Sequence, residues 1–214
     1  MALWRDGAAT GVAHHDARSH AERLPREAQA WLAASGAPLA SVDQFVVVIG
    51  PGSFTGLRVG IAAAQGWALA LARPLAAVPT MDAMVRSLGE RVADDTVVVP
   101  CVDGQRGEVF FGAWDAAAMQ IDAAVAKPVD VVAQVRAIAQ GRRVHIAGDG
   151  AVRYAAEWAA AGWALVTPEM TLAEGALRLV VEARIAAGAP HAVRPLYVRR
   201  TDAEINRERG GRRA

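Results

Sequence analysis

The stretch from Phe45 to Ile61 constrains the fold more than any other part of the chain. It opens with five consecutive apolar residues, passes through a glycine-rich elbow and continues as an apolar helical pattern. A run without polar alternation is typical of a strand covered on both faces, as in the parallel sheets of α/β proteins. Glycine permits a sharp turn, and Ser53 or Thr55 can cap the helix that follows. The sequence therefore predicts a strand, elbow and helix inside an α/β domain.

The elbow has two possible roles. Backbone N–H groups at the positive end of a helix are the usual basis of phosphate sites. The spacing matches neither the P-loop, which ends in Gly-Lys-Ser/Thr, nor G-x-G-x-x-G, because Gly52 and Gly56 are one residue too far apart. Tight packing of the strand against its helix is the other interpretation, and both stay open. The elbow residues considered are Gly50, Gly52, Ser53, Thr55, Gly56 and Arg58.

Composition narrows the class of protein. A chain of 214 residues can form one large domain or two small lobes, and a net charge of +1 gives no sign of autonomous nucleic-acid binding. Cys101 is the only cysteine, which excludes an internal disulfide and a thiolate zinc site. We interpret it as a buried structural thiol. The longest apolar run, Val59 to Ala72, is too short to span a bilayer, and we predict a cytoplasmic protein without membrane contact.

Two helical patterns flank the predicted strand. The first, over residues 19–35, has an apolar stripe formed by Leu24, Ala28, Trp31 and Leu32. The second, reaching about residue 72, has a ridge of small residues at every fourth position, formed by Gly56, Gly60, Ala64, Ala68 and Ala72. Another helix could approach that ridge closely, within the chain or in a partner. Leu57, Ile61 and Leu69 are expected to cover the sheet.

The rest of the chain alternates between strands and helices. The pattern predicts strands at 75–78, 96–102 and 144–147, a turn at 105–107, and helices at 80–88, 128–139 and 171–187. The stretch 90–95 is the expected boundary between two lobes. Periodicity alone establishes only the α/β class.

Several motifs resemble those of one family. Gly-Pro-Gly-Ser-Phe-Thr-Gly-Leu-Arg-Val-Gly at 50–60 resembles the signature of the TsaB family, also called YeaZ. Further resemblances occur, in order, at His20 with Leu24-Pro25, at 102–110, at 148–151 and at 194–199. The resemblance implies two ribonuclease-H-like lobes of the actin, sugar-kinase and Hsp70 superfamily. We assign 1–93 to an N-terminal lobe, 94–206 to a C-terminal lobe and 207–214 to a disordered tail, which is solvated or contacts RNA.

The beginning of the chain departs from the family pattern. Family members open with a hydrophobic strand ending in Asp-Thr-Ser/Thr, whereas Met1 to Gly7 resembles the strand that returns from it. We expect the first strand of the N-terminal lobe to be missing from this sequence and the true start to lie upstream. If Met1 is authentic, another element or another chain must complete the sheet.

Catalytic motifs are weak. His14, His15 and His20 lack the i, i+4 spacing that places two imidazoles on one helical face, so no metal site is expected. Ser53 lies outside the Gly-x-Ser-x-Gly setting of a nucleophile. Asp103 and Glu108 could form a carboxylate pair or could be hairpin charges exposed to water.

The resemblance implies a non-catalytic scaffold for the transferase TsaD, which makes threonylcarbamoyladenosine beside the tRNA anticodon, with TsaE as the ATPase. No cofactor of its own is implied, only ATP and an interface nucleotide in the complex. tRNA would be reached through that complex, and the chain alone could form a homodimer. The implied interface residues are Leu24, Ala28, Trp31, Leu32, Gly56, Gly60, Ala64 and Ala68. The alternative is a stand-alone metal-independent peptidase or ATP-dependent enzyme that uses the glycine-rich loop.

Overall fold

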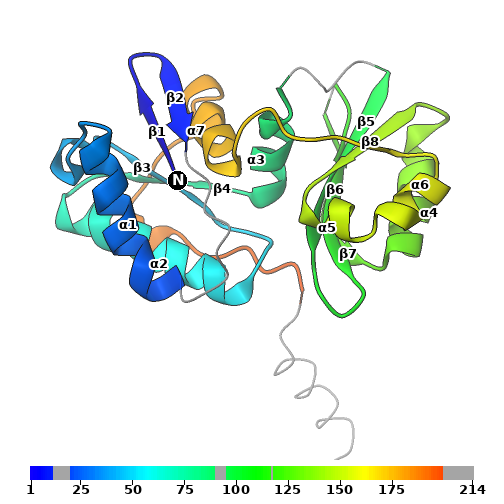
Figure 1. Cartoon of the computed structure of the whole chain (residues 1–214), viewed down its shortest axis with the longest axis horizontal. Coiled ribbons are helices and arrows are strands. Elements are labelled where there is room, and N and C mark those ends of the chain that lie inside the picture. Colours follow the sequence, from blue (N-terminus) through cyan, green and yellow to red (C-terminus); the bar gives the residue numbers. More distant parts are fainter. Residues whose placement is uncertain (12–19, 90–94, 117, 200–214) are drawn as a thin grey trace, which may run out of the picture.

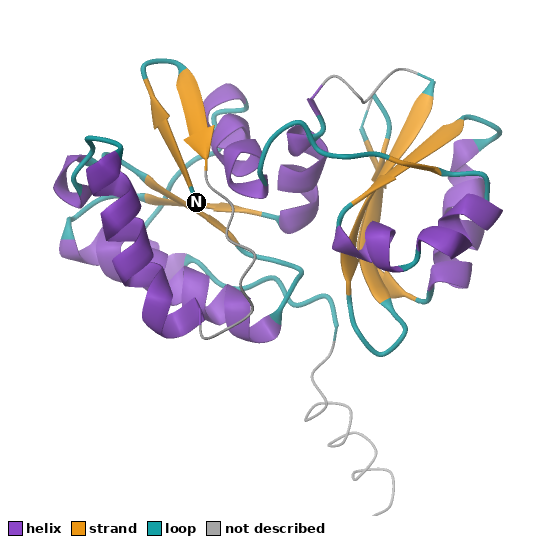
Figure 2. Ribbon diagram, viewed as in Figure 1, coloured by secondary structure: helices purple, strands orange, loops and turns teal. Residues whose placement is uncertain are grey.

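The computed structural model describes residues 1–11, 20–89, 95–116 and 118–199. These form two lobes that lie side by side and are joined by α3 and by the chain around α7 (Figures 1 and 2). Each lobe combines strands with helices, which confirms the predicted α/β class. In the described part of the chain, no helix is long and apolar enough to cross a membrane.

The second lobe is built on a five-stranded sheet in the order β7-β6-β5-β8-β9. Its strands are β5 (Thr96–Asp103), β6 (Val109–Trp114), β7 (Met119–Ala126), β8 (Arg143–Ala147) and β9 (Ala164–Leu165). The pairs β5 with β6 and β6 with β7 are antiparallel, whereas β8 is parallel to both β5 and β9. One face is covered by α4 (Pro128–Ala139), α5 (Asp149–Arg153) and α6 (Ala155–Ala160). The predicted strands and the helix at 128–139 are confirmed.

The first lobe contains two separate strand pairs. The pair β1 (Ala2–Arg5) and β2 (Ala8–Gly11) is an antiparallel hairpin, and β3 (Phe45–Val48) is parallel to β4 (Leu75–Val78). Helices α1 (His20–Ala34) and α2 (Phe54–Ala70) lie together on one side, and η1 (Leu39–Ser41) connects α1 to β3. The predicted strand, elbow and helix unit is therefore present, with both ends within two residues of the expectation.

Helix α3 (Thr80–Ser87) packs against the second lobe. Met81 and Met84 join a core cluster with Phe110 and Trp114 of β6. Leu88, directly after the helix, is fully buried in a cluster with residues of β5 and β8. The segment following the first lobe's last strand therefore holds the two lobes together.

The end of the described chain returns to the first lobe. Helix α7 (Leu172–Glu182) places Ala176 and Val180 in one cluster with β4, and η3 (Pro190–Ala192) lies against α2. Within the range 94–206 assigned to the C-terminal lobe, Ala176, Val180 and Val193 therefore make their apolar contacts with first-lobe elements. Residues 90–94 of the expected boundary at 90–95, and the tail at 207–214, lie outside the described residues. Helix α7 ends five residues before the predicted position, since Arg184 has a left-handed φ of 52°.

Candidate functional site

The glycine-rich elbow is held by capping and by the returning end of the chain. The Ser53 hydroxyl accepts a hydrogen bond from the Gly56 N–H at 3.3 Å and so caps α2. The Leu196 N–H donates to the Ile49 carbonyl at 2.8 Å, directly before the elbow. Gly50 has a φ of 116°, and a Cβ there would lie 2.7 Å from the Leu196 carbonyl oxygen. Only glycine satisfies both conditions.

Arg58 is held by an aromatic pair beside the elbow. Its guanidinium lies 3.8 Å from the centre of the Phe54 ring, and its Nε donates to the Tyr197 hydroxyl at 2.9 Å. The two rings stack with centroids 5.4 Å apart. The guanidinium of Arg58 is therefore engaged with Phe54 and Tyr197. These contacts favour the packing interpretation of the elbow over the phosphate interpretation. The nucleotide expected at the interface of the complex is not tested by them.

The ridge of small residues on α2 faces the inside of the molecule. Ala64 and Ala68 are buried in a cluster with Ile61, Leu75 and Val193, and Ala68 is 0% exposed. Gly60 lines a cavity that is partly open to solvent, and Gly56 lies against Ser53. At Ala64 and Ala68 the close contacts of this ridge are therefore made within the chain. Leu69, expected on the sheet side, is 56% exposed, and that expectation is wrong.

The apolar stripe of α1 is also mostly internal. Ala28 and Leu32 are buried, and Leu24 and Trp31 are half-buried and line the same cavity as Gly60. Four of the eight expected interface residues, Ala28, Leu32, Ala64 and Ala68, are thus buried in this structure. The other four, Leu24, Trp31, Gly56 and Gly60, are half-buried.

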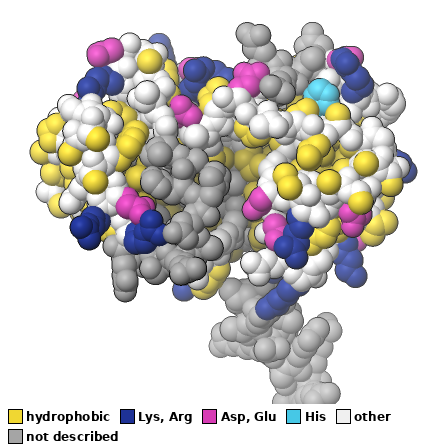
Figure 3. All heavy atoms as spheres, viewed as in Figure 1, with side chains coloured by type: hydrophobic (Ala, Val, Ile, Leu, Met, Phe, Trp, Pro, Cys, Tyr) yellow, Lys and Arg dark blue, Asp and Glu magenta, His cyan; other side chains and the backbone are white. Residues whose placement is uncertain are grey.

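The exposed faces of the two helices carry many small side chains together with three arginines. On α2 they comprise Phe54, Thr55, Arg58, Ala62, Gly66, Leu69 and Ala70, and on α1 they comprise Arg23, Pro25, Arg26, Gln29, Ala30, Ala33 and Ala34. Apolar side chains are visible over α1 in Figure 3. Sequence reasoning missed these faces because α2 carries small residues on two sides, and the spacing of Ala62 and Gly66 is the same as that of the internal ridge.

The acidic residues of the β5–β6 turn are held by different arginines. Asp103 lies 3.4 Å from Arg153, and its N–H donates to Asp149 at 2.9 Å. Glu108 lies 2.6 Å from Arg199, which also donates to the Gly104 carbonyl. Separate ion pairs favour the interpretation of hairpin charges over a catalytic carboxylate pair. Among the described residues, no group of three histidines, cysteines or acids could hold a metal ion.

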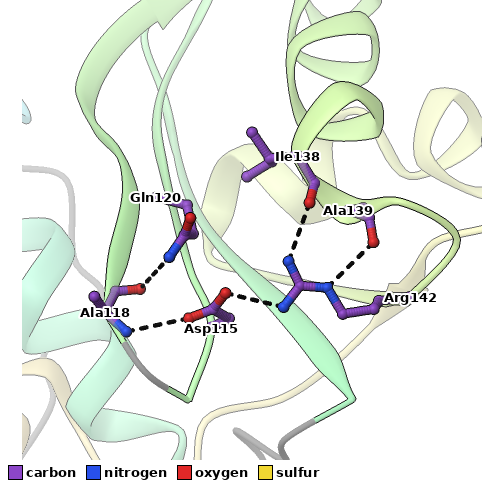
Figure 4. Close-up of polar contacts among 6 residues, drawn as sticks. All are labelled: Asp115, Ala118, Gln120, Ile138, Ala139 and Arg142. Carbon is purple, nitrogen blue, oxygen red and sulfur yellow. Dashed lines mark hydrogen bonds and ion pairs between the residues drawn. The ribbon is translucent and has the colours of Figure 1, made fainter.

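The remaining candidates are structural or lie outside the description. Cys101 is buried in β5, and burial, followed by the charges of Asp149 and Asp103, raises the pKa of its thiol. His14 and His15 lie outside the described residues, as does the side chain of His20. Figure 4 shows another polar cluster. Arg142 donates to the Asp115 carboxylate at 2.9 Å and to the Ile138 carbonyl at the end of α4. Its other donors go to backbone carbonyls, which is a helix-capping arrangement.

Comparison with known proteins identifies the family. The model of the TsaD family, described as tRNA N6-adenosine threonylcarbamoyltransferase, matches residues 11–208. The chain belongs to this family. A solved structure from Pseudomonas aeruginosa, described as similar to the peptidase YeaZ, superposes with a TM-score of 0.73 at 27% identity. The match covers 92% of this chain and 93% of that one. YeaZ from Pseudomonas aeruginosa gives a TM-score of 0.68 at 26% identity, with 92% of both chains covered.

Proteins that are similar in sequence include one named TsaB. The Escherichia coli tRNA threonylcarbamoyladenosine biosynthesis protein TsaB is 34% identical over 114 residues, which cover 53% of this chain and 49% of that protein. A Mycobacterium bovis protein is 39% identical over 116 residues, which cover 54% of this chain and 52% of that protein. The chain thus spans about half the length of the curated relatives it matches. The predicted resemblance to TsaB and YeaZ, and the fold class with it, is confirmed.

Proposed function

We propose that this chain takes part in threonylcarbamoyladenosine biosynthesis on tRNA as a scaffold for TsaD and catalyses no step itself. The observation that carries the proposal is the likeness to TsaB of Escherichia coli along the sequence, together with the YeaZ fold over nearly the whole chain. The relatives that bear the transferase's own name support the choice of TsaD as partner, among them one from Solidesulfovibrio magneticus at 44% identity over 78 residues. TsaE and tRNA would join through that complex.

The geometry supports a scaffold better than an enzyme. The candidate thiol is buried, and the hydroxyl of Ser53 caps a helix. Asp103 and Glu108 are bound to separate arginines. A residue that serves as nucleophile or base needs a reacting partner within hydrogen-bond reach, and these contacts are to structural groups instead.

The docking surface that we propose is the exposed side of α1 and α2. Small side chains allow the backbone of another helix to come close, and the aromatic pair with Arg58 lies at the start of the same helix. Docking would stabilise one conformation of TsaD by the difference in affinity of this chain for the two conformations. Any ATP or interface nucleotide would belong to the assembled complex.

The experiment is a binding measurement with TsaD from the same source. Ala62→Arg places a long cation on the proposed surface, and we expect it to weaken the complex about tenfold or more, because the helices can no longer approach. The matched control is Ala133→Arg, which makes the same change at an exposed position of α4 on the second lobe. Size-exclusion chromatography with light scattering reports the complex, and circular dichroism reports folding. Equal binding by both variants would contradict the docking surface.

Activity assays test the non-catalytic part of the proposal. The purified chain alone should neither hydrolyse ATP nor cleave peptides above background. If the chain hydrolysed ATP or cleaved peptides and Ser53→Ala abolished that activity, the non-catalytic proposal would be overturned in favour of an enzyme that uses the elbow. If the free chain forms a homodimer and TsaD dissociates it, both contacts would use the same helix faces.

A further inference from the structure

An exposed row of residues along α2 begins with an aromatic ring and a cation. Every fourth residue belongs to it, and all five members are exposed: Phe54, Arg58, Ala62, Gly66 and Ala70. Residues at this spacing lie on one face of a helix. Arg58 is the only charged residue among the 17 of α2. The single charge of the helix therefore lies one turn from Ala62, on the docking surface proposed above.

The rings that hold Arg58 are themselves open to solvent. Phe54 is 45% exposed and Tyr197 is 42% exposed, although the two rings stack on each other. Leu196, next to Tyr197 in the chain, is 37% exposed. Aromatic residues and arginine are the types enriched where protein interfaces concentrate their binding energy. We call Phe54, Arg58 and Tyr197 the Arg58 cluster.

The guanidinium of Arg58 has donors that its neighbours do not use. One face lies against the ring of Phe54, and the Nε donates to the Tyr197 hydroxyl. Among the described residues, no group accepts a hydrogen bond from the two terminal nitrogens, and no acidic side chain forms an ion pair with Arg58. Two parallel N–H groups of an arginine match the two oxygens of a carboxylate. The free end of the side chain is therefore a donor fork for an anion.

The cluster is fixed before any partner arrives. The Leu196 N–H donates to the Ile49 carbonyl at 2.8 Å on one side of Tyr197. On the other side, Arg199 donates to the Gly104 carbonyl at 2.7 Å. The ring between these two contacts orients Arg58 through its hydroxyl. An arginine held in this way loses less rotamer freedom on binding than a free surface arginine does.

We propose that the Arg58 cluster is the centre of the docking surface, and that Arg58 binds the carboxylate of an aspartate or glutamate of the partner protein. The inference rests on the proposed function, which names TsaD as that partner. Beyond Arg58 the exposed row is small and uncharged, which suits a helix that brings one acidic side chain. An RNA strand would require cations along its path, and α2 supplies one.

The test measures the affinity of the full chain for TsaD from the same source, in the absence of tRNA and nucleotide. Arg58→Gln should weaken the complex about tenfold or more, because the partner's carboxylate is left unpaired. Arg58→Glu should be about tenfold weaker again, since two carboxylates then face each other. The matched control is Arg136→Gln at an exposed arginine of α4, which should change the affinity less than about twofold.

Two conservative variants separate the fork from the charge. Arg58→Lys keeps the charge but has neither the fork nor the planar group that stacks on Phe54, and we expect binding about fivefold weaker. Tyr197→Phe keeps the ring and removes the hydroxyl that orients Nε, and we expect a loss of about threefold. Added salt should weaken the unmodified complex more than the Arg58→Gln complex. This salt comparison needs only one variant, and thermal melting checks that each variant is folded.

Four outcomes would overturn the proposal. If Ala62→Arg weakens binding and Arg58→Gln does not, the docking surface stands and the Arg58 cluster is not its centre. If Arg58→Glu and Arg58→Gln bind equally, the partner presents no carboxylate there. If the loss appears only after ATP or tRNA is added, a phosphate meets Arg58 instead of the partner protein. If neither Ala62→Arg nor Arg58→Gln weakens binding, the docking surface itself is wrong, and the cluster's role with it.

Discussion

At the scale of single residues, Cys101 shows how the sheet controls reactivity. Its side chain is fully buried, and burial raises the pKa of the thiol well above its usual range. The nearby carboxylates of Asp149 and Asp103 act in the same direction. Since the thiolate is the reactive species, a raised pKa means that little of it exists near neutral pH.

We therefore predict that Cys101 resists thiol reagents in the folded protein. At about pH 8 an unfolded chain should react quickly, because an ordinary thiol is partly ionised there. The folded chain should react only through opening of the lobe, so raising the pH from about 8 to about 9 should accelerate labelling only about threefold, because the opened thiol has an ordinary pKa and is already partly ionised. Labelling with an aromatic disulfide, with and without denaturant, measures both rates. Fast labelling of the folded chain would show that β5 is not covered as described.

Two glycines allow a matched prediction of opposite sign. Gly148 has a φ of 115°, and a Cβ there would lie 2.2 Å from the Cys101 carbonyl oxygen. Gly66 lies within α2, and a Cβ there meets no atom within 4 Å. Gly148→Ala should lower the free energy of unfolding by about 3 kcal/mol or more, through strain and overlap. Gly66→Ala should raise it by about 0.5–1 kcal/mol. Chemical denaturation measures both, and a loss at Gly66 would mean that α2 is packed on that side.

At the scale of elements, the sequence predicts what depends on neighbours along the chain. The strand at β3 and the helix α2 follow from apolar runs, glycine and a capping serine, all within seventeen residues of one another. The orientation of α2 cannot be predicted from its neighbours along the chain, because Ala64 and Ala68 are buried partly by Val193. A contact between residues so distant along the chain leaves no local pattern, which is why periodicity alone places Leu69 on the wrong side of the helix.

The same limit explains the elbow and α7. The position of Arg58 beside the elbow allows a phosphate contact, whereas its actual partner, Tyr197, comes from the end of the described chain. The capping threonine of α7 is predictable, since Thr171 and Glu174 have the capping spacing, but the lobe on which α7 packs is not. Local rules predict where a helix begins, and long-range contacts determine what it covers.

The cap of α7 gives a prediction at this scale. The Thr171 hydroxyl accepts from the Glu174 N–H at 3.2 Å, and the Glu174 carboxylate accepts from the Thr171 N–H at 2.8 Å. Thr171→Ala should lower the free energy of unfolding by about 1 kcal/mol. Thr55→Ala, in the exposed first turn of α2, is the control and should change it by less than about 0.5 kcal/mol. Equal effects in urea denaturation would show that the cap adds nothing to stability.

At the scale of the whole molecule, the two lobes differ in how their cores are assembled. The main core of the second lobe is made by residues between Val97 and Trp163, a continuous part of the chain. The cores of the first lobe require Ala176, Val180 and Val193 from beyond the second lobe. The second lobe can therefore keep its core when the first loses its packing, whereas the first lobe depends on the returning chain.

Gly175 is the place to test this asymmetry. It lies where α7 crosses α3, and a Cβ there would come within 2.4 Å of the Ala83 carbonyl oxygen and 3.1 Å of Ser87. Gly175→Ala must push the helices apart, because a backbone oxygen cannot yield as a flexible side chain can. Hydrogen exchange should then become faster in β4 and remain nearly unchanged in β6, whose residues Val109, Phe111 and Ala113 lie in the continuous core. Equal acceleration in both strands would mean that α3 couples the lobes into one cooperative unit, through its burial against β6 on one side and α7 on the other.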